Sequence, residues 1–233
     1  MNKESLLREL SLRGIELSKN QVDSLFNLMR TTLEANEKFN LTAITDEESF
    51  LEKMIFDSAL VMVDNNFDGK KVLDFGTGAG FPGLVMHILN PKMDLTLLDS
   101  NSKKINYLTE YCQANNMNIN CASDRGENYS KNKVEEFDYV VARAVAPLNI
   151  LLEVISQSIK VSGYLIAMKG LNYEQEINES TSALKRLGFE IEHIFEDNLP
   201  SNGDKRAIIY IKKIKTTPKK YPRDYSEIKR KPL

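Results

Sequence analysis

The sequence is poor in the residues that build metal sites and disulfide scaffolds. It contains no tryptophan, two cysteines and two histidines among 233 residues. Cys112 and Cys121 form no CxxC pair, and only His87 and His193 are available to complete a set of metal ligands. We therefore expect two reduced thiols and no metal site. His87 lies in an apolar helical stretch and His193 in an apparent strand, so neither is a candidate catalytic residue.

Long apolar runs are also missing. No run reaches the roughly 20 residues that a membrane-spanning helix needs, and residues 1–13 lack the apolar core of a signal peptide. Hydrophobic residues make up 42% of the chain and charged residues 27%, as in globular rather than disordered proteins. The sequence therefore predicts a cytoplasmic protein without membrane association, organised as one domain with short extensions.

Acidic residues are scarce near the end of the chain. Residues 212–233 hold nine basic and two acidic residues, a net charge of +7, although the whole chain carries −2. The remainder therefore carries −9. A basic tail on an acidic body suggests a polyanionic partner, and a solvated tail that serves solubility is an equally weighted alternative.

Hydrophobic spacing divides the chain into helices and strands. Helical spacing covers most of the first 40 residues and residues 47–63. Strands are expected at 72–75, 95–98, 119–122, 137–142, 163–168, 189–195 and 207–211. Further helices are expected at 82–89, 103–115, 148–159 and 174–187. This alternation predicts an α/β fold with a doubly wound, mostly parallel seven-stranded Rossmann-like sheet. Its strands should end at a shared ligand-binding edge.

A glycine-rich turn follows the first of these strands. Asp74, Gly76, Gly78 and Gly80 give acid-x-Gly-x-Gly-x-Gly spacing ahead of Phe81. Glycines adopt backbone angles closed to other residues and let a ligand lie against the chain. A dinucleotide loop has Gly-x-Gly-x-x-Gly spacing instead, and a carboxylate beside the turn repels a pyrophosphate. The turn therefore favours a ligand with a cationic amino-acid group.

A second carboxylate, Asp99, ends the next expected strand. An acid there can accept hydrogen bonds from both hydroxyls of a ribose, which fits an adenosyl ligand or NAD. The alternative is a helix cap, a role that Ser100 or Ser102 can fill instead. Gly126 and Glu127 follow the third strand, where an adenine edge can be read. Together these features resemble the class I S-adenosylmethionine-dependent methyltransferases.

Motifs along nearly the whole chain narrow the resemblance. They lie at residues 40–45, 57–58, 72–83, 97–100, 103–104, 142–148, 168–170, 205–206, 220–223 and 231–233. With them the chain resembles the glucose-inhibited division protein B family, the small-subunit ribosomal RNA guanine-N7 methyltransferases G (RsmG). Two places depart from that family: Met54 stands where members usually carry histidine, and residues 224–228 replace a small, proline-containing stretch.

The resemblance implies methyl transfer from S-adenosylmethionine to N7 of a guanosine in the decoding-region loop of bacterial 16S rRNA. Matched positions imply cofactor contacts from Gly76, Phe81, Gly126, Glu127 and Arg143, in addition to Asp74, Gly78, Gly80 and Asp99. Arg125, Lys169 and Arg206 match basic positions near the cleft, and together with Lys220 and Arg223 of the tail they are candidate RNA contacts. For Arg143, an ion pair with Asp74 or Glu127 is as plausible as a contact to the target base.

The implied domain organisation has three parts. Residues 1–66 form a helical extension, 67–214 the S-adenosylmethionine-binding methyltransferase domain and 215–233 the basic tail. The extension is either a docking surface or a lid on the sheet, and we favour the lid. The implied partner is 16S rRNA or the small ribosomal subunit. If the RNA fold buries the target base, that base is turned out of its loop to reach the methyl group. We expect a monomer.

The implied chemistry needs no general base, because guanine N7 has a free lone pair and carries no proton. Catalysis then rests on orientation and exclusion of water. Three other functions stay open: a methyltransferase of this fold acting on a protein or small molecule, a NAD-dependent oxidoreductase, and a cofactor-binding RNA module without catalysis. The loop spacing and Asp74 disfavour NAD, and the intact loop with Asp99 disfavours a module without catalysis.

Overall fold

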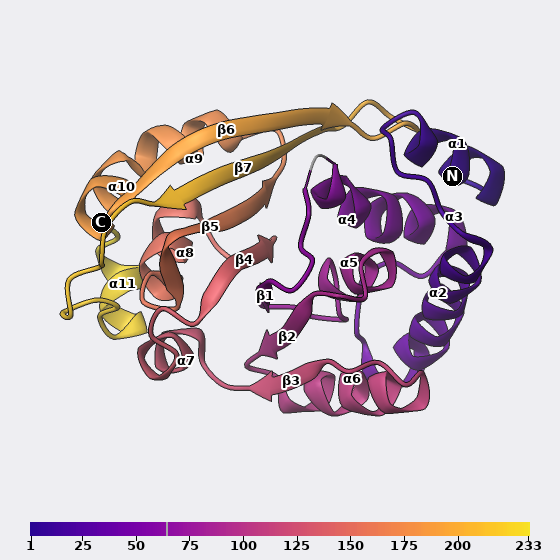
Figure 1. Cartoon of the computed structure of the whole chain (residues 1–233), viewed down its shortest axis with the longest axis horizontal. Helices are drawn as coiled ribbons and strands as arrows, with labels where there is room; N and C mark the ends of the chain where they lie inside the picture. Colours follow the sequence, from indigo (N-terminus) through magenta and orange to yellow (C-terminus); the bar gives the residue numbers. More distant parts are fainter. Residues whose placement is uncertain (64) are drawn as a thin grey trace.

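Seven strands form one mixed sheet in the computed structural model, which describes residues 1–63 and 65–233 (Figure 1). The strands are β1 (Lys71–Phe75), β2 (Asp94–Asp99), β3 (Asn120–Ser123), β4 (Phe137–Arg143), β5 (Ile159–Lys169), β6 (Phe189–Asn198) and β7 (Lys205–Lys213). Their order is β3-β2-β1-β4-β5-β7-β6. Neighbours from β3 to β5 are parallel, whereas β7 is antiparallel to β5 and β6. The predicted α/β fold with a mostly parallel seven-stranded sheet is confirmed.

Helices cover both faces of the sheet (Figure 1). They are α1 (Lys3–Ser11), α2 (Lys19–Phe39), α3 (Glu47–Phe50), α4 (Asp57–Ala59), α5 (Gly83–Leu89), α6 (Ser102–Ala114), α7 (Gly126–Asn132), α8 (Leu148–Ile155), α9 (Tyr173–Glu179), α10 (Thr181–Leu187) and α11 (Tyr225–Arg230). Buried side chains of α1–α6 form one hydrophobic cluster with the sheet, and those of α7–α11 form a second. Among the described residues, none of these helices combines the length and apolar character that crossing a bilayer requires.

The N-terminal helices pack onto one face of the sheet. Helix α2 begins at a capping box in which Ser18 and Gln21 bond each other's backbone N–H groups. Leu6 and Leu25 are fully buried in the same cluster as Leu84 of α5. This packing is what a lid on the sheet requires, while the division of the chain into three segments stays a prediction.

Several helices differ from their predicted form. The predicted helix 47–63 is a single helical run in which a π-helical segment, η1 (Leu51–Phe56), separates α3 from α4, and a 3₁₀ segment, η2 (Leu60–Met62), follows α4. The predicted helix 174–187 is divided into α9 and α10 at Ser180, whose Oγ donates to Glu176 O (2.6 Å). Helices α7 and α11 were not predicted, because six or seven residues are too short to show an apolar period.

The basic tail is folded against α8. Thr217, Tyr221 and Ile228 are buried, and Arg223 forms an ion pair with the fully buried Glu153 of α8. The alternative of a solvated tail is therefore wrong for these residues, although most of the tail's lysines are exposed. Apolar and ionic contacts determine the position of the tail. The composition of the segment does not reveal these contacts.

The ligand-binding edge lies where the strand order reverses. β2 and β3 extend from β1 to one side, and β4 and β5 extend to the other. In such a sheet the ligand-binding crevice lies at the carboxyl ends of the strands, beside the turns that follow β1 and β4. A Cβ atom added to Gly76, after β1, would lie 2.7 Å from Val145 Cγ2, after β4. The two turns are thus in direct contact at this point.

Candidate active site

The glycine-rich turn after β1 is held by two sets of hydrogen bonds. The backbone N–H groups of Gly76 and Thr77 donate to Leu98 O in β2, at 2.8 and 2.9 Å. From within the core, Asp74 Oδ2 accepts from Thr77 Oγ1 (2.6 Å) and from Gly83 N (2.8 Å). The protein therefore fixes the conformation of this turn through its own contacts.

Asp74 braces the turn from inside the core. It is 1% exposed, and its Oδ1 has no hydrogen-bond partner among the described residues. Burial raises the pKa of Asp74 from 3.8 to about 6, against the opposing effect of the bonds from Thr77 and Gly83. This carboxylate lines neither of the two cavities at the sheet edge, and its contact with a cationic ligand stays a prediction.

The raised pKa of Asp74 should make the fold less stable as the pH rises. The folded state binds this proton more tightly than the unfolded state, so the free energy of unfolding should fall between about pH 4 and pH 6. The charged carboxylate costs on the order of 3 kcal/mol at neutral pH, since each unit of the change in pKa from 3.8 to about 6 corresponds to about 1.4 kcal/mol. Urea unfolding from pH 4.5 to 7.5 should show that Asp74→Asn removes this slope. A wild-type stability that rises with pH relative to the variant would contradict the assignment.

The glycines of the turn have positive φ for different reasons. Gly76, Gly78 and Gly80 have φ values of +70°, +59° and +97°. A Cβ atom at Gly80 would lie 2.4 Å from Leu84 Cδ1, whereas nothing lies within 4 Å of a Cβ atom at Gly78. Gly80 therefore permits close packing against α5, and Gly78 leaves open space.

Alanine at these two glycines should separate packing from backbone strain. Gly80→Ala should lower the free energy of unfolding by about 2 kcal/mol, because a positive φ and overpacking against Leu84 act together. Gly78→Ala should cost about 1 kcal/mol, because only the backbone angle opposes it. Urea unfolding of both variants measures the difference. Equal losses would show that Leu84 moves aside without cost.

The smaller of the two cavities, which we call the Asp99 pocket, has a volume of about 230 Å³. Its lining includes Gly76, Asp99, Arg125, Gly126, Glu127, Val145 and Tyr225. Asp99 Oδ2 accepts from Gly78 N (2.9 Å), and Oδ1 accepts from Asn101 N (2.8 Å). Asn101 caps α6 itself, so Asp99 is not needed as the helix cap. The structure thus brings Gly76, Asp99, Gly126 and Glu127 together around one cavity, whereas Gly78 and Gly80 are not among the described residues that line it.

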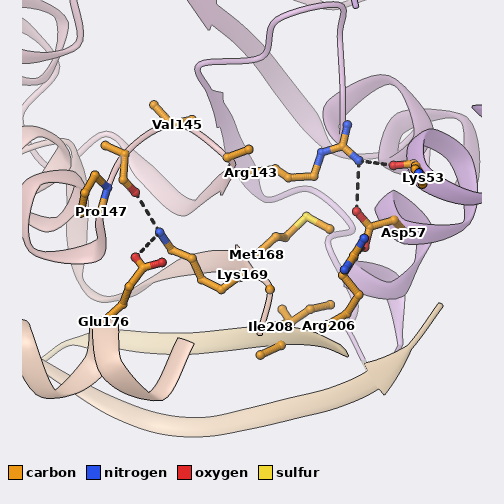
Figure 2. A pocket seen from close by; sticks show the side chains of 14 residues that line it. Lys53, Asp57, Arg143, Val145, Pro147, Met168, Lys169, Glu176, Arg206 and Ile208 are labelled. Carbon is orange, nitrogen blue, oxygen red and sulfur yellow. Dashed lines mark hydrogen bonds and ion pairs between the residues drawn. The ribbon is translucent and has the colours of Figure 1, made fainter. Parts of the chain in front are cut away.

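The larger cavity, which we call the Asp57 pocket, has a volume of about 640 Å³ and shares Ala144, Val145 and Ala146 with the Asp99 pocket. Figure 2 shows Arg143, Asp57 and Arg206 on one side of it and Lys169 with Glu176 on the other. Lys169 is 8% exposed in its side chain, and its Nζ lies 2.6 Å from Glu176 Oε2 and 2.8 Å from Ala146 O. The predicted RNA residues Lys169 and Arg206 therefore line the same cavity.

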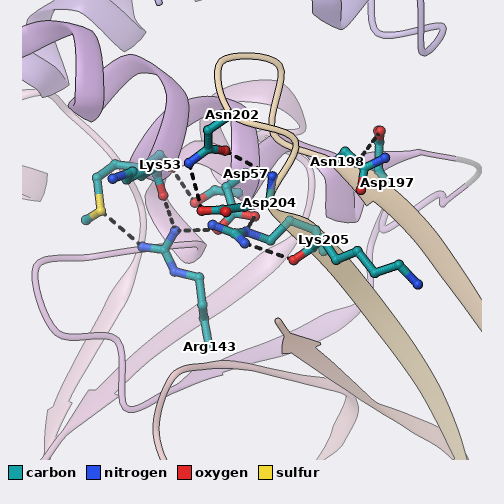
Figure 3. Close-up of polar contacts among 11 residues, drawn as sticks. Lys53, Asp57, Arg143, Asp197, Asn198, Asn202, Asp204 and Lys205 are labelled. Atoms are coloured by element: carbon teal, nitrogen blue, oxygen red, sulfur yellow. Dashed lines mark hydrogen bonds and ion pairs between the residues drawn. The ribbon is translucent and has the colours of Figure 1, made fainter. Parts of the chain in front are cut away.

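Arg143 lines the Asp57 pocket and not the Asp99 pocket. Its Nη1 donates to Asp57 Oδ2 (3.2 Å) and to Lys53 O (2.7 Å), as Figure 3 shows. The alternative of an ion pair with Asp74 or Glu127 is therefore wrong, because the partner is a carboxylate from the N-terminal segment. The guanidinium faces the larger cavity.

Met54, where the resembling family usually has histidine, contacts the same arginine. Arg143 Nη2 lies 3.3 Å from Met54 Sδ. Met54 is 8% exposed and belongs to the hydrophobic cluster of the N-terminal helices. The substitution thus places a thioether against one edge of the Arg143 guanidinium.

Some predicted residues lie outside both cavities. Phe81 is 3% exposed and packs its ring on Phe50, with 5.4 Å between the ring centroids. Lys220 and Arg223 are not among the described residues that line either cavity. Sequence reasoning missed Asp57 and Glu176 as site residues: Asp57 was visible only as part of a family motif, and no signal pointed to Glu176.

Comparison with known proteins identifies close relatives over the full length. A family model described as GidB, rRNA small subunit methyltransferase G, matches residues 21–202. The Ribosomal RNA small subunit methyltransferase G of Thermoanaerobacter sp. (strain X514) is 42% identical over 234 positions, covering 99% of this chain and 98% of the relative. The protein of the same name from Oceanobacillus iheyensis is 37% identical over 227 positions, covering 96% and 95%.

Solved structures share the fold at low sequence identity. A SAM dependent methyltransferase from Aquifex aeolicus superposes with a TM-score of 0.52 at 19% identity, covering 71% of this chain and 94% of that one. M. jannaschii TYW2 in complex with AdoMet gives a TM-score of 0.54 at 14% identity, covering 74% and 80%. At such identities the likeness concerns the fold alone.

Proposed function

The chain belongs to the rRNA small subunit methyltransferase G family, and from this premise we propose that it methylates N7 of a guanosine in the decoding-region loop of 16S rRNA, using S-adenosylmethionine. The observation that carries the proposal is the joining of two unlike cavities at Ala144–Ala146. One is built around a glycine turn and a carboxylate, and the other is lined by four cationic side chains, Lys53, Arg143, Lys169 and Arg206. A nucleoside cofactor and an RNA base can therefore meet at their boundary.

The residues of the Asp99 pocket fit the proposed cofactor. The Asp99 carboxylate stands beside the open space at Gly78, where two hydroxyls of a ribose find an acceptor. Gly76, Gly126 and Glu127 supply further parts of the wall. The smaller cavity alone is below the usual size of a small-molecule site, so the cofactor must extend past Val145 toward the Asp57 pocket. That extension brings its reactive end to the base.

The chemistry asks the protein for orientation. When bound, the cofactor supplies a methyl group on a positively charged sulfur. Guanine N7 attacks through a lone pair that carries no proton, so no side chain has to act as a general base. The chain's own residues hold the two reactants in line and exclude water, which can account for roughly 7–11 kcal/mol of the barrier.

The RNA contacts follow from exposed charge around the cleft. Arg125 is exposed at the rim of the Asp99 pocket, and Arg206 keeps 23% of its side chain exposed in the other cavity. Lys220 is exposed on the tail and can reach phosphates outside the cleft, whereas Arg223 is committed to Glu153. Phosphate contacts from Arg125 and Lys220 give salt-dependent affinity without base information. We propose that the enzyme acts as a monomer in the cytoplasm, the compartment of the proposed substrate.

Transfer of a labelled methyl group tests the proposal. The purified protein is incubated with labelled S-adenosylmethionine and with small ribosomal subunits, naked 16S rRNA or ribosomal protein as separate acceptors. We expect label in RNA. Label confined to protein, or no transfer to either RNA acceptor, would contradict the proposed function.

A further inference from the structure

Asp57 is shared by two arginines that line the larger cavity. Its Oδ2 lies 3.2 Å from Arg143 Nη1, and its Oδ1 lies 3.1 Å from Arg206 Nε. The three side chains are 8%, 15% and 23% exposed for Asp57, Arg143 and Arg206. The two arginines come from the ends of β4 and β7. One carboxylate therefore fixes two guanidinium groups at the wall of the Asp57 pocket and leaves a net positive charge.

The helical run before Asp57 contributes to this arrangement. The π-helical segment η1 ends at Phe56, directly ahead of Asp57. Two of its residues also hold Arg143, through Lys53 O at 2.7 Å and Met54 Sδ at 3.3 Å (Figure 3). π-Helical segments occur frequently at functional sites. The local winding thus directs a carboxylate, a carbonyl oxygen and a sulfur toward one guanidinium.

The wall offers donors and has little acceptor capacity to spare. A guanidinium has five N–H donors, of which Arg143 uses three and Arg206 two in the described part of the chain. Both oxygens of Asp57 already accept from these arginines. On the opposite wall, Glu176 accepts from Lys169 and from Leu148 N (2.9 Å), both through Oε2. A ligand group that faces the two arginines therefore meets N–H donors, with both Asp57 oxygens already engaged.

We propose that Asp57 is a positioning residue that holds Arg143 and Arg206 as paired donors to O6 of the target guanine. This inference rests on the proposed function and adds the basis of base selection. Guanine presents N7 and O6 as adjacent acceptors, whereas adenine presents an amino group beside N7. Donors on O6 hold guanine while leaving N7 free for the methyl group. The same donors face the adenine amino group without an acceptor for its hydrogens, so adenine is rejected.

Initial-rate kinetics with small ribosomal subunits tests the proposal. Asp57→Asn should lower kcat/KM about 10- to 100-fold, the range expected for loss of a base-reading contact, and should leave the affinity for S-adenosylhomocysteine unchanged. Arg206→Lys should lower kcat/KM about 10-fold, because lysine keeps the positive charge but lacks the planar guanidinium with its paired donors. Replacing the target guanosine of the subunits by adenosine should lower the kcat/KM of wild type. That decrease should be at least as large as the decrease that Asp57→Asn causes on guanosine.

Asp197→Asn is the matched control. Asp197 forms an ion pair with Arg13, and the two side chains are 17% and 18% exposed. This pair also joins the N-terminal segment to the sheet, and Asp197 is not among the described residues that line the cleft. The Asp197→Asn variant should have a lower melting temperature and the kcat/KM and base preference of wild type. If Asp57→Asn does not fold, Arg206→Lys provides the test.

Three results would overturn the inference. The first is a kcat/KM within two-fold of wild type for both Asp57→Asn and Arg206→Lys. The second is full activity of Arg206→Lys while Arg206→Ala changes the salt dependence of RNA affinity, which would indicate a phosphate contact. The third is an equal wild-type rate on subunits with adenosine and with guanosine at the target position. A wild type that methylates neither kind of subunit would instead contradict the proposed function itself.

Discussion

Asp99→Ala should weaken binding of S-adenosylhomocysteine by about 100-fold. A hydrogen bond to a charged group contributes about 1.5–3 kcal/mol, and the proposed ribose contact uses two of them, so the loss is about 3 kcal/mol or more. The same carboxylate holds Gly78 N at 2.9 Å and Asn101 N at 2.8 Å. Its removal therefore also loosens the glycine turn against α6. Isothermal titration calorimetry measures the affinity directly.

Asp99→Asn is the control for this prediction. The amide retains an oxygen and the shape of the side chain but lacks the charge and one acceptor, so an intermediate loss is expected. The melting temperature of each variant without ligand reports whether the turn stays folded. Affinity within two-fold of wild type for Asp99→Ala would contradict the ribose role, whatever the melting temperature shows.

Arg223→Ala should destabilise the protein by about 3–5 kcal/mol, because it leaves a buried carboxylate uncompensated. Glu153 is 0% exposed. It accepts from Arg223 N (3.1 Å), Nε (2.7 Å) and Nη2 (2.7 Å). The loss should appear in the free energy of unfolding measured with urea. Deletion of the tail from Thr217 should destabilise the protein for the same reason, in addition to any effect on RNA affinity.

Lys219→Ala is the control on the same tail. Lys219 is exposed, so its removal should change the free energy of unfolding by no more than about 0.5 kcal/mol. A double variant, Glu153→Gln with Arg223→Ala, should recover part of the loss because the buried charge is gone. If Arg223→Ala proved as mild as Lys219→Ala, the tail would not be anchored through Glu153.

The glycine turn and Asp99 were predictable because their signals are local. A strand, a turn with glycines at fixed spacing and a carboxylate at the end of the next strand place residues at one sheet edge once the fold is known. The structure puts Gly76 and Asp99 at the same cavity, as that reasoning requires. The orientation of Asp74 was not predictable from spacing, because the bonds to Thr77 and Gly83 that turn it inward depend on the shape of the turn.

Long-range pairings were out of reach of sequence reasoning. The ion pairs of Asp57 join residues 86 and 149 positions apart, and neither partner carries a local pattern that names the other. Composition was misleading for the tail, where the excess of lysines conceals that Tyr221 and Ile228 are buried. In both cases tertiary contacts, and not propensity or spacing, decide where a charged side chain lies.

Identification of the methylated nucleoside is the most direct test of whether the cleft presents guanine N7 to S-adenosylmethionine. Small ribosomal subunits are treated with the protein, and their RNA is digested to nucleosides and analysed by mass spectrometry. We predict that 7-methylguanosine appears with wild type and is strongly reduced with Asp99→Ala. A methyl group on adenosine, on another atom of guanosine or on a pyrimidine would contradict the proposed arrangement of the two cavities.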